Sequence, residues 1–453
     1  MKCSAGSLSS RVNSAAERRD GGGGNGVVFA APIGESIGGI MTWFGRGSSS
    51  IGSRCRRLVV LSTAMLLVVG MTVAPVAQVA AASPAATHLD GARLQALLDE
   101  LVVDGAPGVL ALVDDGPGPA WTGASGQARF DPWVPLRGSA RFRVGSITKT
   151  MIATVVLQLV GEGTLRLDDS VERWLPGLVP NGAAITVRQL LNHTSGIFNY
   201  TDDPAFLGAL FTDPTQTRSP QSLVAIATAH PPLFPPGAGW SYSNSNYILA
   251  GLIIQAATGH SPQSELSRRI FTPLGLHGTS FPVTDRGING YHAHGYLLPR
   301  NPFVPTSQPL DVTTLINPSW AWTAGAVIST AGDLARFYGA LLGGRLLSPA
   351  LLTQMETTVP INPVFGYGLG LYSTRTVCGT VWGHNGSVPG YNSVALSSGD
   401  GKRHMVLMIS TEPDAQTGPL LDLTQSTAIC QMLGQDLDAA AAPTTAGAPA
   451  LLR

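Results

Sequence analysis

The sequence predicts an α+β fold, in which helices flank one antiparallel sheet and a helical lobe is inserted between the early and late strands. Segments 108–116 and 120–130 alternate like the two strands of a hairpin. Three further strand-like segments lie between residues 366 and 411. The intervening chain, from about 166 to 320, holds short helical pieces rich in Pro and Asn. Both ends of the chain are therefore expected to complete a single sheet.

The helices that flank this sheet follow from hydrophobic spacing. In segment 88–105, leucines recur at helical intervals after Asp90, which is placed to cap the helix. Segment 145–163 is apolar nearly all round, so we expect a central, buried helix. Three more helices are predicted over 186–196, 329–344 and 420–433.

Composition excludes one broad class of function. The chain has 453 residues, a formal net charge of zero and only 12% charged residues. A nucleic-acid-binding protein carries a basic excess, so we exclude that class. The apolar content of 44% is enough for a sizeable core.

The first 82 residues read as an extension and an export signal. Residues 1–53 are of low complexity, and translation from Met41 would leave an ordinary start. Residues 54–82 contain three arginines, then an apolar run and then an Ala-Ala-Ala cleavage site. This order favours a cleaved export signal over a retained membrane anchor. We expect a secreted or cell-envelope protein that contacts the membrane only if this signal stays uncleaved. The folded domain is expected over 88–436, with a disordered tail over 437–453.

Two cysteines remain after the predicted cleavage. Cys378 precedes a predicted strand, and Cys430 lies in the closing helix, which we expect to pack beside that strand. Cysteines of exported proteins are more often paired than free. We therefore predict a Cys378–Cys430 disulfide.

The strongest chemical signal is one lysine inside the buried helix. The chain has only three lysines, and Lys149 follows Ser146 by three residues, so both side chains lie on one helix face. An amine beside a hydroxyl can withdraw its proton and make it a nucleophile, whereas arginine is too basic for that exchange. The alternative is an N-capping serine and a lysine that reaches the surface.

Two further segments carry suitable polar groups. In "WSYSNSNY", Tyr242 and Asn244 alternate, so a phenol able to act as a general base and a carboxamide point the same way. Taken alone, this segment is a helix cap. In "WGHNGSVPGY", His384 supplies a polarising or cationic group, Gly386 allows close backbone approach, and the Ser387 N–H can face an oxyanion.

Together these motifs resemble the serine penicillin-recognising enzymes. S-x-x-K at Ser146 is followed by Y-x-N at Tyr242 and H-x-G at His384, in the family's order. The Y-x-N form is similar to the branch of class C β-lactamases, secreted D-alanyl-D-alanine carboxypeptidases, D-aminopeptidases and esterases. The resemblance covers roughly 89–432, and it includes "LLNHTSG", "AGAVISTAGDLARF" and "GYGLGL".

The resemblance implies a β-lactamase-like fold and a role for each residue. Ser146 is the acylated nucleophile, and Lys149 and Tyr242 handle its proton. Asn244 holds the substrate amide, and the N–H groups of Ser146 and Ser387 form the oxyanion hole. The strand residues expected to bind a substrate carboxylate are His384 as imidazolium, Asn385 where the family usually has threonine, Gly386 and Ser387.

These roles define an exported serine hydrolase that acts through an acyl-enzyme and needs no cofactor and no metal. We expect a penicillin-binding D-alanyl-D-alanine carboxypeptidase, whose partners are peptidoglycan peptides and β-lactams. The enzymatic alternatives are a class C-type β-lactamase and an esterase. The alternative of another class is a non-catalytic peptidoglycan-binding envelope protein.

Other tempting patterns are given a structural interpretation. "GESIG" (34–38) matches a nucleophile elbow but precedes the export signal. His193 and Ser195 are assigned to a helix end, and His292 with His294 to an exposed loop without a metal-ligand cluster.

Overall fold

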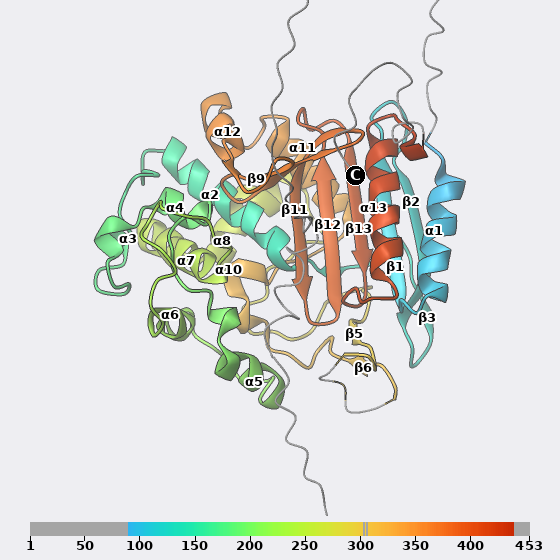
Figure 1. The fold of residues 1–453 in the computed structure, drawn as a ribbon, viewed down its shortest axis with the longest axis horizontal. Coiled ribbons are helices and arrows are strands. Elements are labelled where there is room, and N and C mark those ends of the chain that lie inside the picture. Colours follow the sequence, from blue (N-terminus) through green and yellow to red (C-terminus); the bar gives the residue numbers. More distant parts are fainter. Residues whose placement is uncertain (1–88, 302–303, 305–306, 439–453) are drawn as a thin grey trace, which may run out of the picture. The chain divides into compact units, whose positions relative to one another are not determined.

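The computed structural model describes residues 89–301, 304 and 307–438. The predicted extension, the export signal with its cleavage site, the "GESIG" segment and the tail beyond residue 438 lie outside the described residues. Within them, the predicted α+β arrangement is confirmed: helices cover both faces of an antiparallel sheet, and a helical lobe lies at one side of it (Figure 1).

The sheet has nine strands and draws on both ends of the described chain. Its order is β3-β2-β1-β13-β12-β11-β10-β9-β8. β1 pairs antiparallel with β13, with Val109 opposite Ile409, so the early hairpin and the late strands join as predicted. The strands are β1 Gly108–Asp114, β2 Trp121–Arg129, β3 Val134–Pro135, β8 Val359–Pro360, β9 Phe365–Tyr367, β10 Tyr372–Thr376, β11 Gly379–Val388, β12 Tyr391–Ser397 and β13 His404–Ile409.

Two helices cover each face of the sheet. On one face, α1 and α13 enclose a core that contains Leu94, Leu98 and Leu101. The carboxylate of Asp90 accepts the Arg93 N–H at 2.9 Å, which caps α1 as the sequence predicts. On the opposite face, α2 and α11 enclose the larger core. The bounds are α1 Gly91–Val103, α2 Thr148–Gly161, α11 Ala331–Leu342 and α13 Gly418–Met432.

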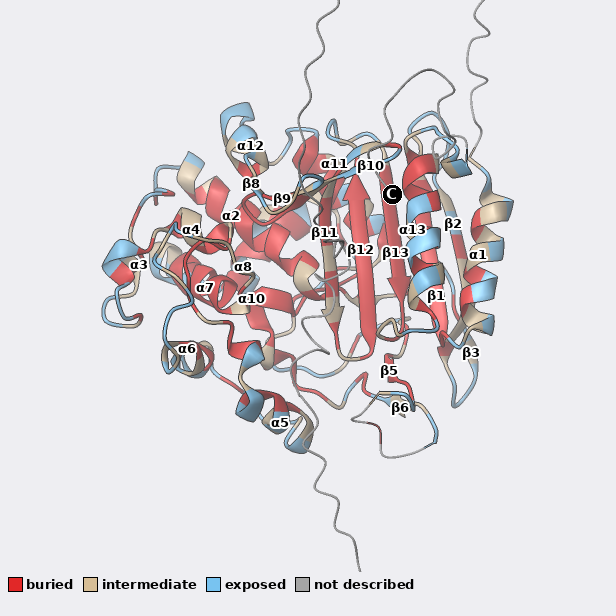
Figure 2. Ribbon diagram, in the orientation of Figure 1, coloured by how far each residue is buried: buried red, intermediate tan, exposed pale blue. Residues whose placement is uncertain are grey.

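The lobe is helical except for one short strand pair. Its centre is α7, buried along most of its length (Figure 2). The pair β5–β6 stands below the end of β13, where the Tyr296 N–H donates to the Ser410 carbonyl oxygen. The helices of this part and its borders are α3 Val171–Trp174, α4 Val187–Leu191, α5 Pro204–Thr212, α6 Pro220–Thr228, α7 Asn244–Thr258, α8 Pro262–Leu266, α9 Thr272–Leu274, α10 Trp322–Gly325 and α12 Pro349–Glu356.

Short elements complete the chain. Two two-residue pairs are β4 Phe142–Arg143 with β7 Ile328–Ser329, and β5 Tyr296–Leu297 with β6 Leu310–Asp311. The other short turns are η1 Gly145–Ile147, η2 Gly182–Ala184, η3 Tyr200–Asp202, the π-helical η4 Ser267–Phe271 and η5 Pro318–Trp320. In the described part of the chain, no helix combines the length and the apolar character needed to cross a membrane.

The two cysteines of the folded part are joined. Cys378 and Cys430 form a disulfide with a Cα–Cα distance of 5.2 Å, which confirms the predicted pair. It ties the turn before β11 to α13, and both residues are buried. The strand that carries the third motif is therefore anchored covalently to the closing helix.

Candidate active site

The nucleophile candidate lies where a tight turn leads into the buried helix. Ser146 is the middle residue of η1, and α2 begins at Thr148. Gly145 has a φ of +52°, and a side chain there would meet the backbone nitrogen of Ser387 at 2.7 Å. Glycine is needed both for this left-handed conformation and for the close approach of β11.

Lys149 is fully buried and held by three oxygen atoms. Its Nζ lies 2.9 Å from the Ser146 Oγ. It donates to the Asn244 Oδ1 and to the Ala324 carbonyl oxygen, each at 2.7 Å. Desolvation by burial lowers the pKa of Lys149 well below its ordinary value. A neutral amine has two N–H donors and one lone pair, so this geometry leaves the lone pair to accept the Ser146 proton.

Asn244 is the first residue of α7 and is fixed at both ends of its carboxamide. Oδ1 accepts from Lys149, and Nδ2 donates to the Thr201 Oγ1 at 3.1 Å. Its backbone N–H donates to the Asn199 Oδ1 at 2.9 Å. The segment therefore serves as a helix start and also brings a carboxamide to Lys149.

Tyr242 completes the group around the serine. Its phenol hydrogen-bonds with the Ser146 side chain, and its ring centroid lies 4.8 Å from the Lys149 Nζ. Desolvation by burial raises the pKa of Tyr242 above its ordinary value of 10. Burial thus favours the protonated phenol of Tyr242 and the neutral amine of Lys149, the two groups predicted to handle the Ser146 proton.

The strand β11 offers a free edge to this group. Within β11, only residues Gly379–Gly383 pair with β10. Among the described strands, His384–Val388 therefore have a partner on one side alone, β12. At this edge, a side chain at Gly386 would lie 2.0 Å from the Val144 carbonyl oxygen and 2.8 Å from the Ser146 nitrogen. The backbones of η1 and β11 thus meet beside Ser146. Asn385 and Ser387 are half-buried on this edge.

His384 differs from the expectation of a cationic substrate ligand. Its Nδ1 donates to the Asn385 carbonyl oxygen at 2.5 Å, since a carbonyl only accepts. Its Nε2 then accepts from the Tyr367 hydroxyl at 2.8 Å. Desolvation by burial lowers the pKa of His384 to about 3. Both ring nitrogens are used within the protein, because the side chain turns inward rather than along the free edge.

Two side chains at this site lie beyond the three motifs. Tyr367, on β9, bonds His384, and His193, in the loop after α4, packs 4.4 Å from the Tyr242 ring. The segments "GYGLGL" and "LLNHTSG" carried the only sequence signal for them. His292 and His294 stack on each other at 5.0 Å, and His294 bonds Asp311 at 2.6 Å. Nowhere in residues 89–438, as far as they are described, do three potential metal ligands cluster.

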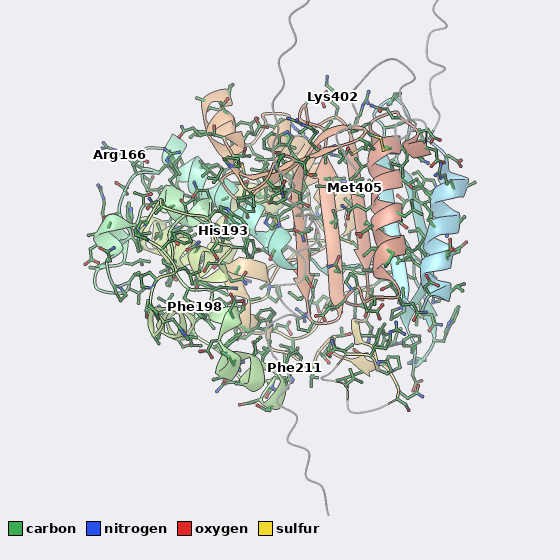
Figure 3. All side chains as sticks on the ribbon, viewed as in Figure 1. Arg166, His193, Phe198, Phe211, Lys402 and Met405 are labelled. Carbon is green, nitrogen blue, oxygen red and sulfur yellow. A yellow bond between two sulfur atoms is a disulfide. The ribbon has the colours of Figure 1, made fainter. Side chains whose placement is uncertain are left out.

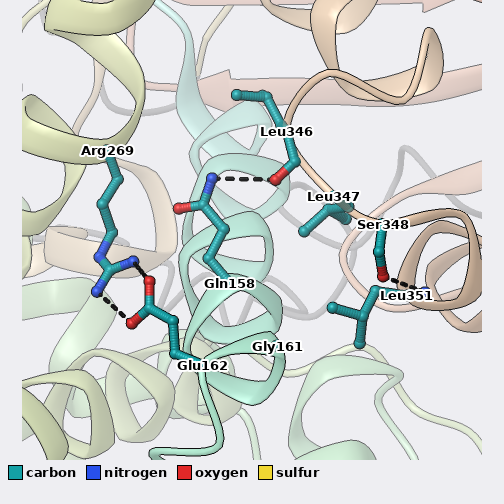
Figure 4. Close-up of a pocket in the computed structure, with 8 residues that line it drawn as sticks. All are labelled: Gln158, Gly161, Glu162, Arg269, Leu346, Leu347, Ser348 and Leu351. Atoms are coloured by element: carbon teal, nitrogen blue, oxygen red, sulfur yellow. Dashed lines mark hydrogen bonds and ion pairs between the residues drawn. The ribbon is translucent and has the colours of Figure 1, made fainter.

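A separate cavity of about 430 Å³ lies at the far end of α2 (Figure 4). Gln158 and Glu162 line it, and Gln158 lies about 14 Å from Lys149 along the helix axis. Its cation, Arg269, is already bonded to Glu162 and to Glu265. None of its lining residues belongs to the motifs around Ser146.

The fold agrees with comparisons to known proteins. Residues 94–425 match the family described as Beta-lactamase, and the chain belongs to that family. It is a serine hydrolase of the β-lactamase and penicillin-binding-protein family, whose members act on amides or esters.

Individual relatives include amide hydrolases and a penicillin-binding protein. A D-stereospecific amidohydrolase from a Streptomyces species is 41% identical, with a TM-score of 0.67, over 74% of this chain and 98% of that one. The D-amino acid amidase of Ochrobactrum anthropi, solved with D-phenylalanine, is 28% identical with a TM-score of 0.65, over 76% and 99%. Penicillin-binding protein 4* of Bacillus subtilis is 28% identical over 64% of this chain, which spans only 65% of that relative's length.

Proposed function

We propose that this protein hydrolyses an amide bond formed by the carbonyl group of a D-amino acid, through an acyl-enzyme on Ser146. One observation carries the choice of substrate. His384 is buried, burial favours its neutral form, and its two ring nitrogens hydrogen-bond with Tyr367 and with the backbone. The free edge of β11 therefore presents no imidazolium to a substrate carboxylate. Such a site suits a leaving group without negative charge, such as ammonia, an amine or an uncharged peptide end.

Acylation begins with a proton transfer to lysine. Ser146 gives its hydroxyl proton to the Lys149 amine while Oγ attacks the substrate carbonyl carbon, which forms a C–O bond and an oxyanion. The N–H groups of Ser146 and Ser387 face that oxyanion. As the intermediate collapses, the C–N bond breaks and the leaving nitrogen takes the Tyr242 phenol proton. Lys149 returns a proton to Tyr242.

Deacylation reverses these roles. Water gives one proton to the Lys149 amine and adds its oxygen to the acyl carbon. The ester bond to Ser146 breaks, and Oγ regains its proton from Lys149. The free D-amino acid or peptide acid leaves. Neither half-reaction consumes a cofactor.

The relatives support the D-configured substrate. The D-stereospecific amidohydrolase matches nearly its whole length to this chain at 41% identity, well above the penicillin-binding proteins at 28–31%. D-aminopeptidases and an esterase are also among the relatives.

D-alanyl-D-alanine carboxypeptidase activity is the second candidate. The half-buried Ser387 on the free edge favours it, because a hydroxyl can donate to a terminal carboxylate. Penicillin binding goes with either candidate, since a β-lactam is an amide held in a ring. We also propose export through residues 54–82, which would place the enzyme in the envelope or outside the cell, where D-amino acid peptides occur.

The test compares three substrates on the mature chain. D-alanine p-nitroanilide, its L-enantiomer and diacetyl-L-Lys-D-Ala-D-Ala are assayed for kcat/KM. We expect the D-anilide to exceed the L-anilide by about 10²-fold, the usual worth of one well-shaped pocket. It should also exceed the tripeptide. Faster release of D-alanine from the tripeptide would replace the amidase by the carboxypeptidase, and equal rates on both enantiomers would refute D-specificity.

A further inference from the structure

His193 combines three features that are unusual together. It is fully buried, it follows α4 within the lobe (Figure 3), and its φ of +63° lies in the left-handed region. Residues other than glycine are uncommon in that region, because the Cβ atom crowds the backbone there. The surrounding structure therefore holds His193 in a backbone conformation that is locally unfavourable.

The backbone carbonyl and the ring nitrogen Nδ1 of His193 both accept hydrogen bonds from the segment that carries Tyr242. Its carbonyl oxygen accepts the Ser241 N–H at 3.0 Å. Its Nδ1 accepts the Ser243 N–H at 3.1 Å and the Asn246 carboxamide at 3.2 Å. The residues directly before and after Tyr242 thus both donate their backbone N–H groups to His193. Asn244 follows directly and reaches Lys149.

These bonds fix the protonation state of the ring. Because Nδ1 accepts two N–H groups, it carries no proton, and the single proton of a neutral imidazole lies on Nε2. Nε2 is buried, and no hydrogen-bond partner for it is found in the described part of the chain. Desolvation by burial lowers the pKa of His193 well below its ordinary value.

The ring face supports the phenol directly. Its centroid lies 4.4 Å from that of Tyr242, 4.8 Å from that of Tyr367 and 5.4 Å from that of Tyr247. Tyr367 in turn bonds His384 on β11. The imidazole therefore lies between Tyr242 and Tyr367 of β9, which links it to His384 on β11.

We propose that His193 is a positioning residue for acylation: its neutral imidazole, protonated at Nε2, holds Tyr242 and Asn244 in register with Ser146. The proposal rests on the proposed roles of Ser146 and Tyr242. It adds that the acceptor at Nδ1 acts through them, without touching the substrate. A misplacement of about 1 Å at such a group costs about 10²-fold in rate.

Paired substitutions separate the acceptor from the bulk of the ring. In His193→Asn, Oδ1 takes the place of Nδ1, and asparagine tolerates the left-handed conformation. In His193→Leu, the volume stays and the acceptor is lost. Asn181→Leu is the matched control, because Asn181 has a φ of +60° at an exposed turn. The acylation rate constant and the dissociation constant of the first complex are measured with an activated D-alanine ester, per titrated serine.

We expect His193→Leu to lower the acylation rate constant about 10²-fold with little change in the dissociation constant, and His193→Asn to recover most of it. Asn181→Leu lowers the melting temperature only. Unchanged acylation in His193→Leu, or no recovery in His193→Asn, overturns the proposal. An unacylated wild-type chain refutes the proposed function instead.

A second measurement does not depend on folding of the variants. Nitrogen-15 NMR of the wild-type protein reports the tautomer of each histidine. We expect His193 to show an unprotonated Nδ1 and a protonated Nε2 between pH 5 and 8, without titrating. A protonated Nδ1, or titration of His193 within this range, overturns the proposal.

Discussion

Replacing Lys149 by methionine tests whether the buried amine is neutral in the folded protein. The amine is fully buried, it donates to two carbonyl oxygens, and burial lowers its pKa well below the ordinary value. In the unfolded chain the same lysine titrates near its usual value of about 10.4. Between these two pKa values, the unfolded state binds one proton more than the native state.

This difference sets the sign and size of the effect. The free energy of unfolding of the wild type rises with pH by about 1.4 kcal/mol per unit across that window, from the lowered folded pKa up to about 10.4. Keeping Lys149 neutral thus destabilises the fold most at low pH. Lys149→Met carries no such group. From pH 7 to pH 9, the wild type should therefore gain stability relative to the variant, by up to about 2.7 kcal/mol where the whole interval lies above the folded pKa.

The assay is reversible urea unfolding of both proteins at pH 7, 8 and 9 with the disulfide intact. Taking the difference between proteins removes every other group that titrates alike in both. Lys402→Met is the control, since Lys402 is an exposed lysine paired with Asp400 at 3.5 Å. It should show no comparable pH-dependent difference. If wild type and Lys149→Met change in parallel with pH, Lys149 is charged in the folded state, and the lone-pair mechanism fails.

Three further outcomes test the site and the fold. Fluorescent penicillin should label the wild type, and Ser146→Ala should abolish labelling; equal labelling would remove Ser146 from its role. Tyr242→Phe keeps the ring beside His193 but should slow acylation by about 10²–10⁴-fold at an unchanged melting temperature, as measured by stopped-flow burst kinetics. The Cys378→Ala, Cys430→Ala double variant should lose up to about 4 kcal/mol in urea unfolding, because the bond closes a loop with a sequence separation of 52. Equal unfolding curves would contradict that entropy argument.

The sequence predicted the parts of this molecule that depend on local pattern. The apolar segment after Gly145 predicted a buried helix, and every residue from Thr148 to Leu157 is buried. The three-residue spacing placed Ser146 beside Lys149, because helix geometry alone decides it. The disulfide was predictable because the fold class makes the closing helix and the third-motif strand neighbours.

The orientation of the His384 side chain at the edge of the sheet was not predictable in the same way. The side chain of His384 had two directions open to it, along the free edge or inward. The choice depends on Tyr367, 17 residues earlier in the chain, whose hydroxyl bonds the ring only once β9, β10 and β11 have paired. A contact of that kind leaves no periodic pattern in the sequence, so the family resemblance suggested an imidazolium at His384 without the Tyr367 contact that holds the ring inward.

The same limit applies to the proton acceptor. The sequence left either the Lys149 amine or the Tyr242 phenol free to take the Ser146 proton. Burial distinguishes the two, since it disfavours the charged form of each group. Two buried groups that share one hydroxyl are both most stable neutral, which makes the amine the acceptor and the phenol the donor. The depth of α2 in the core, more than the identity of the three motif residues, thus decides the direction in which the Ser146 proton moves.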